Sequence, residues 1–196
     1  MNKSTLFFSL LCLLGLHACQ SNEESAAPIP TLGPLRSNIE MGDQGSAQVS
    51  FFASASGDGY ESLEIGTLSA NEQSAIDISF GTINADRISA FVSPASRATT
   101  PTNNGFLSNP MGNNASRTTF KEEPTAPADL AEITPAQVQA ITGNGALTVL
   151  PINTNRTYSF INERGKKGFI RVKAIGDLDG QGDAGREVRF DIIVQR

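Results

Sequence analysis

The residues best suited to nucleophilic and metal chemistry lie together at the start of the sequence. Both cysteines and the only histidine of the 196 residues are Cys12, His17 and Cys19. Thiolate and imidazole side chains ligate tetrahedral zinc and iron centres, and they form the nucleophile–base pairs of serine and cysteine hydrolases. Residues 20–196 contain neither cysteine nor histidine, so a domain built from them is excluded from all of these chemistries.

A second candidate for chemistry is the acidic loop DLDGQGD near the end of the chain. Asp177, Asp179 and Asp183 are spaced like the oxygen ligands of a calcium loop, and Gly182 falls on the sixth position, where such loops need glycine. Val188 stands at the twelfth position, where a bidentate glutamate belongs. Two interpretations stay open: a non-standard calcium site and, favoured, an Asp/Gly turn between two strands. No other cofactor is predicted.

Residues 1–18 have the composition of an export signal. Lys3 precedes eleven apolar-rich residues, 6–16, whereas a membrane-spanning helix needs about 20. The ending Leu-His-Ala-Cys resembles the lipobox of bacterial lipoproteins, although His17 stands where a small or β-branched residue is usual. The resemblance implies that Cys19 becomes the first residue of the mature protein and carries the acyl chains. The alternative is a plain secretory signal that ends near a cysteine.

The lipobox resemblance also predicts where the protein resides. Two or more acyl chains hold a protein on a bilayer essentially permanently, so the chain is expected to be anchored to the membrane by lipid at Cys19. Glu23 and Glu24 are similar to the export signal of Bacteroidota lipoproteins, which favours the outer membrane and its cell-surface face over the periplasmic face. Residues 19–36, which contain three prolines, are expected to form a flexible tether.

The charge of the predicted mature chain narrows the range of partners. Removing Lys3 from the 15 basic and 20 acidic residues leaves a net charge of −6. A basic footprint for nucleic acid is missing, so the expected partners are outer-membrane lipid and an envelope protein or glycan. No cysteine pair is left for a disulfide, and a single domain over residues 37–196 must depend on an ordinary hydrophobic core.

The elements that would position such a site are mostly strands. Apolar residues repeat with a period of two, most clearly at Val188, Phe190, Ile192 and Val194, which predicts a half-buried antiparallel strand. Eight strands are expected, over residues 47–55, 61–66, 75–80, 87–92, 146–150, 157–161, 168–175 and 187–195.

One short helix is expected after Thr134, a good N-cap followed by proline. Short strands separated by turn signals predict an antiparallel β-sandwich, immunoglobulin-like in general architecture, with that helix in a crossover. An open antiparallel sheet with the helix on one face is the alternative architecture.

A long stretch rich in Asn, Thr, Ser and Pro, residues 93–126, interrupts the strands. Loops of this length inside a domain are uncommon. The favoured interpretation is a mobile surface segment pinned at one or two of its apolar residues; the alternative is a binding lid. Those residues are Phe106, Leu107, Met111 and Phe120.

Two stretches carry a family resemblance: GKKGFIRVKAIGDLDGQGDAGREVRFDIIVQR at the end and SFFASASGDGYESLEIG earlier. Both are similar to segments of uncharacterised Bacteroidota surface lipoproteins. The resemblance covers about half of the predicted mature chain. It implies a cell-envelope location and a β-rich fold, and it implies no activity.

Three functions follow as hypotheses. The favoured one is a non-catalytic, lipid-anchored module for binding or adhesion, or an accessory subunit, because reactive side chains are missing and neither a GxSxG nor an SxxK pattern occurs. The second is a carboxylate-dependent hydrolase of envelope or extracellular polysaccharide, which needs two acidic side chains about 5 to 9.5 Å apart. The third is a structural lipoprotein with a calcium-stabilised loop.

Overall fold

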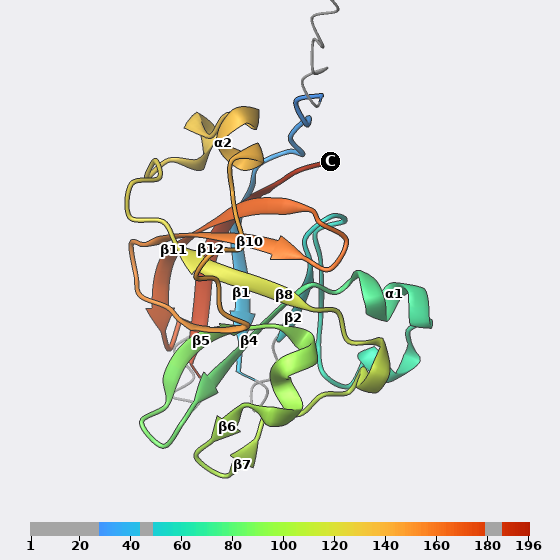
Figure 1. The fold of residues 1–196 in the computed structure, drawn as a ribbon. Helices are drawn as coiled ribbons and strands as arrows, with labels where there is room; N and C mark the ends of the chain where they lie inside the picture. The colour runs from blue at the N-terminus through green and yellow to red at the C-terminus, as the bar shows by residue number, and fades with distance from the viewer. Residues whose placement is uncertain (1–27, 44–48, 179–185) are drawn as a thin grey trace, which may run out of the picture.

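The computed structural model describes residues 28–43, 49–178 and 186–196. Within them the chain forms two five-stranded antiparallel sheets that pack face to face (Figure 1). The predicted mainly β, sandwich-like fold is therefore confirmed, and the open-sheet alternative is wrong.

The two sheets are built from strands that are distant in sequence. The first sheet has the order β1-β12-β11-β10-β8, with bounds Arg36–Gly42, Glu187–Val194, Lys167–Gly176, Thr157–Asn162 and Thr118–Glu122. The second has the order β3-β2-β4-β5-β9, with bounds Asp58–Tyr60, Phe51–Ala53, Ile78–Ile83, Ile88–Val92 and Val149–Pro151. A separate hairpin pairs β6 (Pro101–Thr102) with β7 (Gly105–Phe106).

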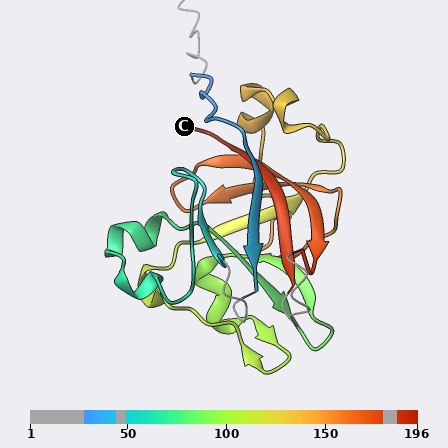
Figure 2. The same cartoon turned by 180° about the vertical axis from the view of Figure 1, so that it is seen from behind.

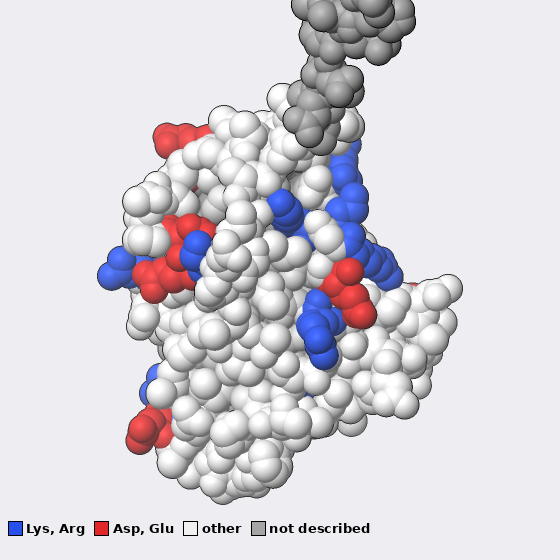
Figure 3. Space-filling view, viewed as in Figure 1, with Lys and Arg blue, Asp and Glu red and all other residues white. Residues whose placement is uncertain are grey.

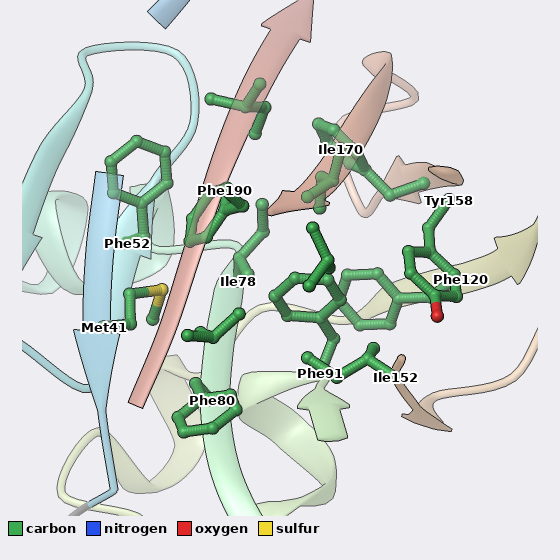
Figure 4. Close-up of a cluster of buried hydrophobic side chains, with 14 of the residues drawn as sticks. Met41, Phe52, Ile78, Phe80, Phe91, Phe120, Ile152, Tyr158, Ile170 and Phe190 are labelled. Atoms are coloured by element: carbon green, nitrogen blue, oxygen red, sulfur yellow. The ribbon is translucent and has the colours of Figure 1, made fainter. Parts of the chain in front are cut away.

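Inward-facing side chains of both sheets share one core (Figure 4). The Phe91 ring of the second sheet lies edge-on to Tyr158 and Phe190 of the first, with ring centroids 6.1 and 5.7 Å apart. Burial of each aromatic ring contributes about 1.5 to 3 kcal/mol. The predicted core face of β12 is confirmed, because Val188, Phe190, Ile192 and Val194 all belong to this core. The strand is not half-buried as predicted, because Asp191 and Ile193 on its other face are buried as well.

The alternation of residues 168–175 predicts that Ile170, Val172 and Ala174 face inward, and this holds only as far as a bulge in β11. Ile170 and Val172 do face the core. The register shifts between Val172 and Ala174, and a bulge turns the following residues to opposite faces. Ile175, in place of Ala174, therefore packs against the core.

The strand predicted at residues 61–66 is wrong. Gly57, with φ 86°, closes a tight turn, and β3 pairs with β2 directly after it. Local hydrogen bonds then take over, since Glu64 Oε2 accepts from the Glu61 amide at 2.9 Å. A 3-10 turn, Ile65–Thr67, follows.

Two α-helices occur in the described ranges where one was predicted. The predicted helix is α2 (Pro135–Gln139), capped by Thr134. The additional helix, α1 (Ala70–Ala75), begins with a capping box between Ser69 and Glu72. No helix in these ranges is long and apolar enough to cross a membrane.

The stretch 93–126 is structured, contrary to the single long loop expected from its composition. It contains two 3-10 turns, Pro94–Thr99 and Gly112–Asn114, together with β6, β7 and β8. Leu107, Met111 and Phe120 are buried, and Phe120 joins the main core through β8. Phe106 is 64% exposed.

The two ends of the described chain lie side by side. The Arg196 amide donates to the Thr31 carbonyl at 2.9 Å, and Leu32 bridges Gln195. The last residues of the predicted tether therefore pair with the domain. Residue 28, Arg196 and α2 lie at one end of the sandwich, and the β6–β7 hairpin lies at the opposite end, in both views (Figure 1; Figure 2).

Candidate binding groove

The outer face of β8 carries the candidate site. Thr118 and Phe120 are buried, whereas Thr119 and Lys121 on the opposite face are partly exposed. Alternation of side chains along a strand places Arg117 and Glu123 on the same outer face. Two hollows open along this row of four residues, which we call the β8 groove.

The first hollow, of about 450 Å³, lies at the beginning of β8. Its walls are partly polar and partly apolar: Ala95, Ala115, Arg117, Thr119, Ile161, Asn162 and Glu163. Ser93 Oγ accepts from the Thr118 amide at 3.0 Å, and Glu163 Oε2 accepts from the Arg117 amide at 3.1 Å. These bonds fix the backbone around the hollow.

The second hollow, of about 230 Å³, lies between the end of β8 and helix α2. Phe169 and Ile141, both buried, form its apolar part, and the remaining lining is mostly polar: Lys121, Glu123, Thr125, Ala126, Gln137, Ala140 and Thr142. Lys167 Nζ donates to the Gln139 and Ile141 carbonyls at 2.8 Å each. A lysine at the carboxyl end of α2 thereby holds this wall in place.

The hollows share one strand and are separated by a short distance. Thr119 lines the first and Lys121 the second, and two residues of a strand rise about 7 Å. From Arg117 to Glu123 the row spans about 20 Å by the same rise. The groove is thus long enough for an extended segment of about six residues.

Some charged side chains of the groove already have a partner of opposite charge, and one does not. Lys121 lies 3.6 Å from Glu123, and Glu123 also accepts from Ser159 Oγ at 2.8 Å. Within the described ranges, no carboxylate lies within ion-pair distance of the Arg117 guanidinium. Arg117 is therefore the cation that remains available to a ligand.

The two carboxylates of the groove lie far apart. Thr119 pairs with Ile161 across the ladder, and the Glu123 amide bonds to the Thr157 carbonyl. Glu163 therefore lies opposite Arg117, six residues along the strand from Glu123, or about 20 Å. Glycosidase carboxylates lie about 5 to 9.5 Å apart, so Glu123 and Glu163 do not have the geometry of such a pair.

A buried carboxylate supports the first hollow from behind. Asp77, only 2% exposed, accepts from the Ser54 amide and from Asn162 Nδ2, both at 2.8 Å, and from Ser54 Oγ. Burial raises the pKa of Asp77, and the hydrogen bonds from Ser54 and Asn162 oppose that shift. Because its oxygens are bonded within the protein, Asp77 orients Asn162, which lines the hollow.

Arg97 fixes the segment that walls the groove and was not recognised in the sequence. Its side chain is fully buried, with Nε donating to the Ser108 carbonyl at 2.7 Å and Nη1 to the Phe80 carbonyl at 2.9 Å. The guanidinium lies 4.5 Å from the centroid of the Phe51 ring. Burial lowers the pKa of Arg97 to about 10, against the opposing charge of Asp43, so the side chain stays charged at neutral pH.

The groove residues have no clear signal in the sequence either, because β8 lies inside the polar stretch whose composition predicts a loop. The only local signal was the alternation in TTFKE, where a single aromatic residue marks the buried face. The walls come from residues 93–95 and 137–142, and proximity across such sequence distances leaves no local pattern.

The predicted site residues fall mostly outside the described ranges. Cys19, Asp179 and Asp183 lie in the parts not described, and Asp177 is exposed just after β11. In the described part of the chain, no group of three Asp, Glu, His or Cys side chains could hold a metal ion. Calcium binding at Asp177, Asp179 and Asp183 and acylation of Cys19 therefore stay predictions.

The comparisons found no similar protein: no family model, no curated protein and no solved structure matches this chain.

Proposed function

We propose that the protein is a non-catalytic binding module of the cell envelope, held on the outer membrane by acylated Cys19 and facing the cell surface. In this proposal the β8 groove binds an extended segment of an envelope protein partner. The module acts in adhesion or as an accessory subunit.

The position of the chain ends supports the anchoring part of the proposal. Residue 28, the first residue described, lies at the α2 end of the sandwich (Figure 1). Only eight residues separate it from Cys19, a stretch that can span at most about 30 Å. An acyl anchor at Cys19 would therefore hold the α2 end toward the bilayer and the β6–β7 hairpin away from it.

The observation that carries the binding part is the row of Arg117, Thr119, Lys121 and Glu123 along two adjoining hollows. Its length suits an extended peptide, and the unpaired Arg117 guanidinium suits a carboxylate on that peptide. Arginine and carboxylate groups form hydrogen bonds of fixed geometry. The wide separation of Glu123 and Glu163 makes binding a better interpretation of this groove than glycoside hydrolysis.

Acylation is tested by mass spectrometry of the protein purified from its own membrane. The expected amino-terminal peptide begins at Cys19 and carries the mass of the acyl chains, and Cys19→Ser releases the protein from the membrane fraction. Protease treatment of intact cells is expected to remove the domain. An unmodified Cys19 with residues 1–18 still attached would overturn the anchor, and full protection in intact cells would overturn surface display.

The groove is tested with a library of extended decapeptides and the full chain in detergent. Peptides with an acidic residue are expected to be enriched. Arg117→Ala is expected to weaken their binding about tenfold, because a hydrogen bond to a charged group contributes about 1.5 kcal/mol. Arg87→Ala, which removes an arginine from the β4–β5 turn, is the matched control. Absence of enrichment, or equal losses in both variants, would refute the groove as the binding site.

A further inference from the structure

The β6–β7 hairpin forms the end of the domain farthest from residue 28 and Arg196 (Figure 1; Figure 2). Thr102 and Gly105 pair across a two-residue turn, and Pro101 pairs with Phe106. The Asn84 amide donates to the Pro101 carbonyl at 2.9 Å, which joins the hairpin to the β4–β5 turn. We call this hairpin, residues 101–106, the distal tip.

The distal tip is fixed from below by its neighbours. Leu107 is buried against Ile83, Ala90 and Val92, and its amide donates to the Thr100 carbonyl at 3.0 Å. The carbonyl of the next residue, Ser108, accepts a hydrogen bond from the buried Arg97 guanidinium. Phe106 is nevertheless 64% exposed, so a short, anchored ladder presents an aromatic ring to solvent.

The chain around the Phe106 ring has amide and hydroxyl side chains and lacks charged ones. The nineteen residues from Ala98 to Ser116 include no acidic or basic side chain. Figure 3 shows the surface around β6 and β7 white, with one basic and one acidic patch beside it at the lower left edge. Asp86 and Arg87, one of each sign, lie in the adjoining β4–β5 turn.

An exposed aromatic ring among uncharged amides and hydroxyls favours one class of ligand. An aromatic face packs against the apolar C–H face of a pyranose ring, and side-chain amides both donate to and accept from sugar hydroxyls. Within residues 98–116 a charged partner finds no complementary charge, and a membrane surface is usually bound by apolar residues together with Lys or Arg. Asn103 and Asn104, both exposed, form the turn of the hairpin that carries Phe106.

We propose that the distal tip is a binding site for uncharged glycans, with the Phe106 ring stacking on a pyranose and Asn103 and Asn104 bonding its hydroxyls. The site is separate from the β8 groove and does not depend on the function proposed for it. Placed at the end away from the anchor, the tip meets glycans outside the membrane that carries the protein.

The test applies the full chain in detergent to an array of neutral and acidic oligosaccharides and to an insoluble uncharged glucan. Retention on neutral glycans is expected, and it should survive about 0.5 M NaCl, because screening acts only on charges. Phe106→Ala is expected to lower retention at least tenfold, whereas Phe106→Trp keeps it. Leu63→Ala removes another apolar side chain, 89% exposed, and should change nothing.

Three outcomes would overturn the proposal: no retention on any neutral glycan, equal retention by Phe106→Ala and the unaltered chain, or retention that only acidic glycans support. Loss of retention in Arg117→Ala would place the site in the β8 groove instead. The thermal unfolding midpoint of each variant shows whether the fold is intact, and an unchanged midpoint is expected for Phe106→Ala because the ring packs little.

Discussion

Asp77 and Arg97 are buried polar side chains that tie together segments distant in sequence. Asp77 joins the end of β2 to the end of β10 through Ser54 and Asn162. Arg97 joins the second sheet to the segment that carries the distal tip. Burial of such groups is tolerated only when their hydrogen bonds are satisfied. Their removal should therefore affect both stability and the shape of the two candidate sites.

Asp77 predicts a particular dependence of stability on pH. Because its pKa is raised in the folded state, the folded protein binds its proton more tightly than the unfolded chain does. The contribution of Asp77 to stability is therefore greatest below about pH 4, the ordinary carboxyl pKa, and falls as pH rises toward the folded pKa. Asn at this position cannot ionise, and it costs about 1 to 3 kcal/mol through lost hydrogen bonds at acid pH.

The measurement is urea unfolding of the unaltered chain and Asp77→Asn across pH 3 to 8. The stability advantage of the unaltered chain over the variant is expected to shrink as pH rises. Asp58→Asn, which alters an exposed carboxylate of β3, should leave that pH profile nearly unchanged. A constant or growing advantage of Asp77 would contradict the prediction.

Arg97→Met is expected to destabilise the protein by about 3 kcal/mol, because the Phe80 and Ser108 carbonyls lose their donor in a buried site. Amide hydrogen exchange at Leu107 should rise at the same time, since the support of the tip is removed. Arg156→Met, at an exposed arginine, is the control and should change stability by less than about 1 kcal/mol. Equal effects of both substitutions would show that burial of Arg97 has no energetic role.

At the scale of elements, the short helix α2 contributes to both the packing of the first sheet and the shape of the second hollow. It covers the outer face of the first sheet through Val138, which packs with Leu130, Phe169 and Ile193 in a second apolar cluster. A five-residue helix has little stability of its own, so its caps and this packing must hold it. The width of the second hollow depends on both.

Thr134→Ala removes one half of the α2 capping box and is expected to cost about 1 kcal/mol. Hydrogen exchange at Val138 and Ile141 should increase, and peptide binding in the β8 groove should weaken. Ser69→Ala removes the equivalent cap of α1 at a similar cost in stability, at a helix that does not line the second hollow. If both variants bind peptide equally well, α2 is not part of the working site.

The difference between α1 and α2 illustrates what the sequence could and could not predict. Thr134 and Pro135 correctly predict the beginning of α2. Ser69 and Glu72 form an equally good capping box, but they do not by themselves predict α1, because few apolar residues follow them. Strands with strict alternation, such as β12, are also predictable, because every second residue faces the main core. The burial of Ile193 on the other face of β12, under α2, has no such local signal. The local sequence pattern is enough to predict a strand where every second residue faces the core.

Elements defined by distant partners were not predictable in the same way. β8 is a strand because it pairs with β10 in the register Phe120–Phe160, and its own sequence has one large apolar residue. The same holds for the sites: Phe106 and Leu107 are neighbours of similar hydropathy, yet only the fold decides that Leu107 is buried and Phe106 exposed. Both candidate sites therefore came from tertiary structure.

At the scale of the whole molecule, the pairing of Thr31 and Leu32 with Arg196 and Gln195, directly after β12, has a mechanical consequence. Residue 28 and the distal tip lie at opposite ends (Figure 1), so a glycan pulling on the tip and lipids holding Cys19 would stretch the domain lengthwise. β1 runs along that line beside β12, and its hydrogen bonds would be loaded together in shear instead of being unzipped one by one. A strand held in this way resists force well, which would suit the lipid-anchored module proposed above.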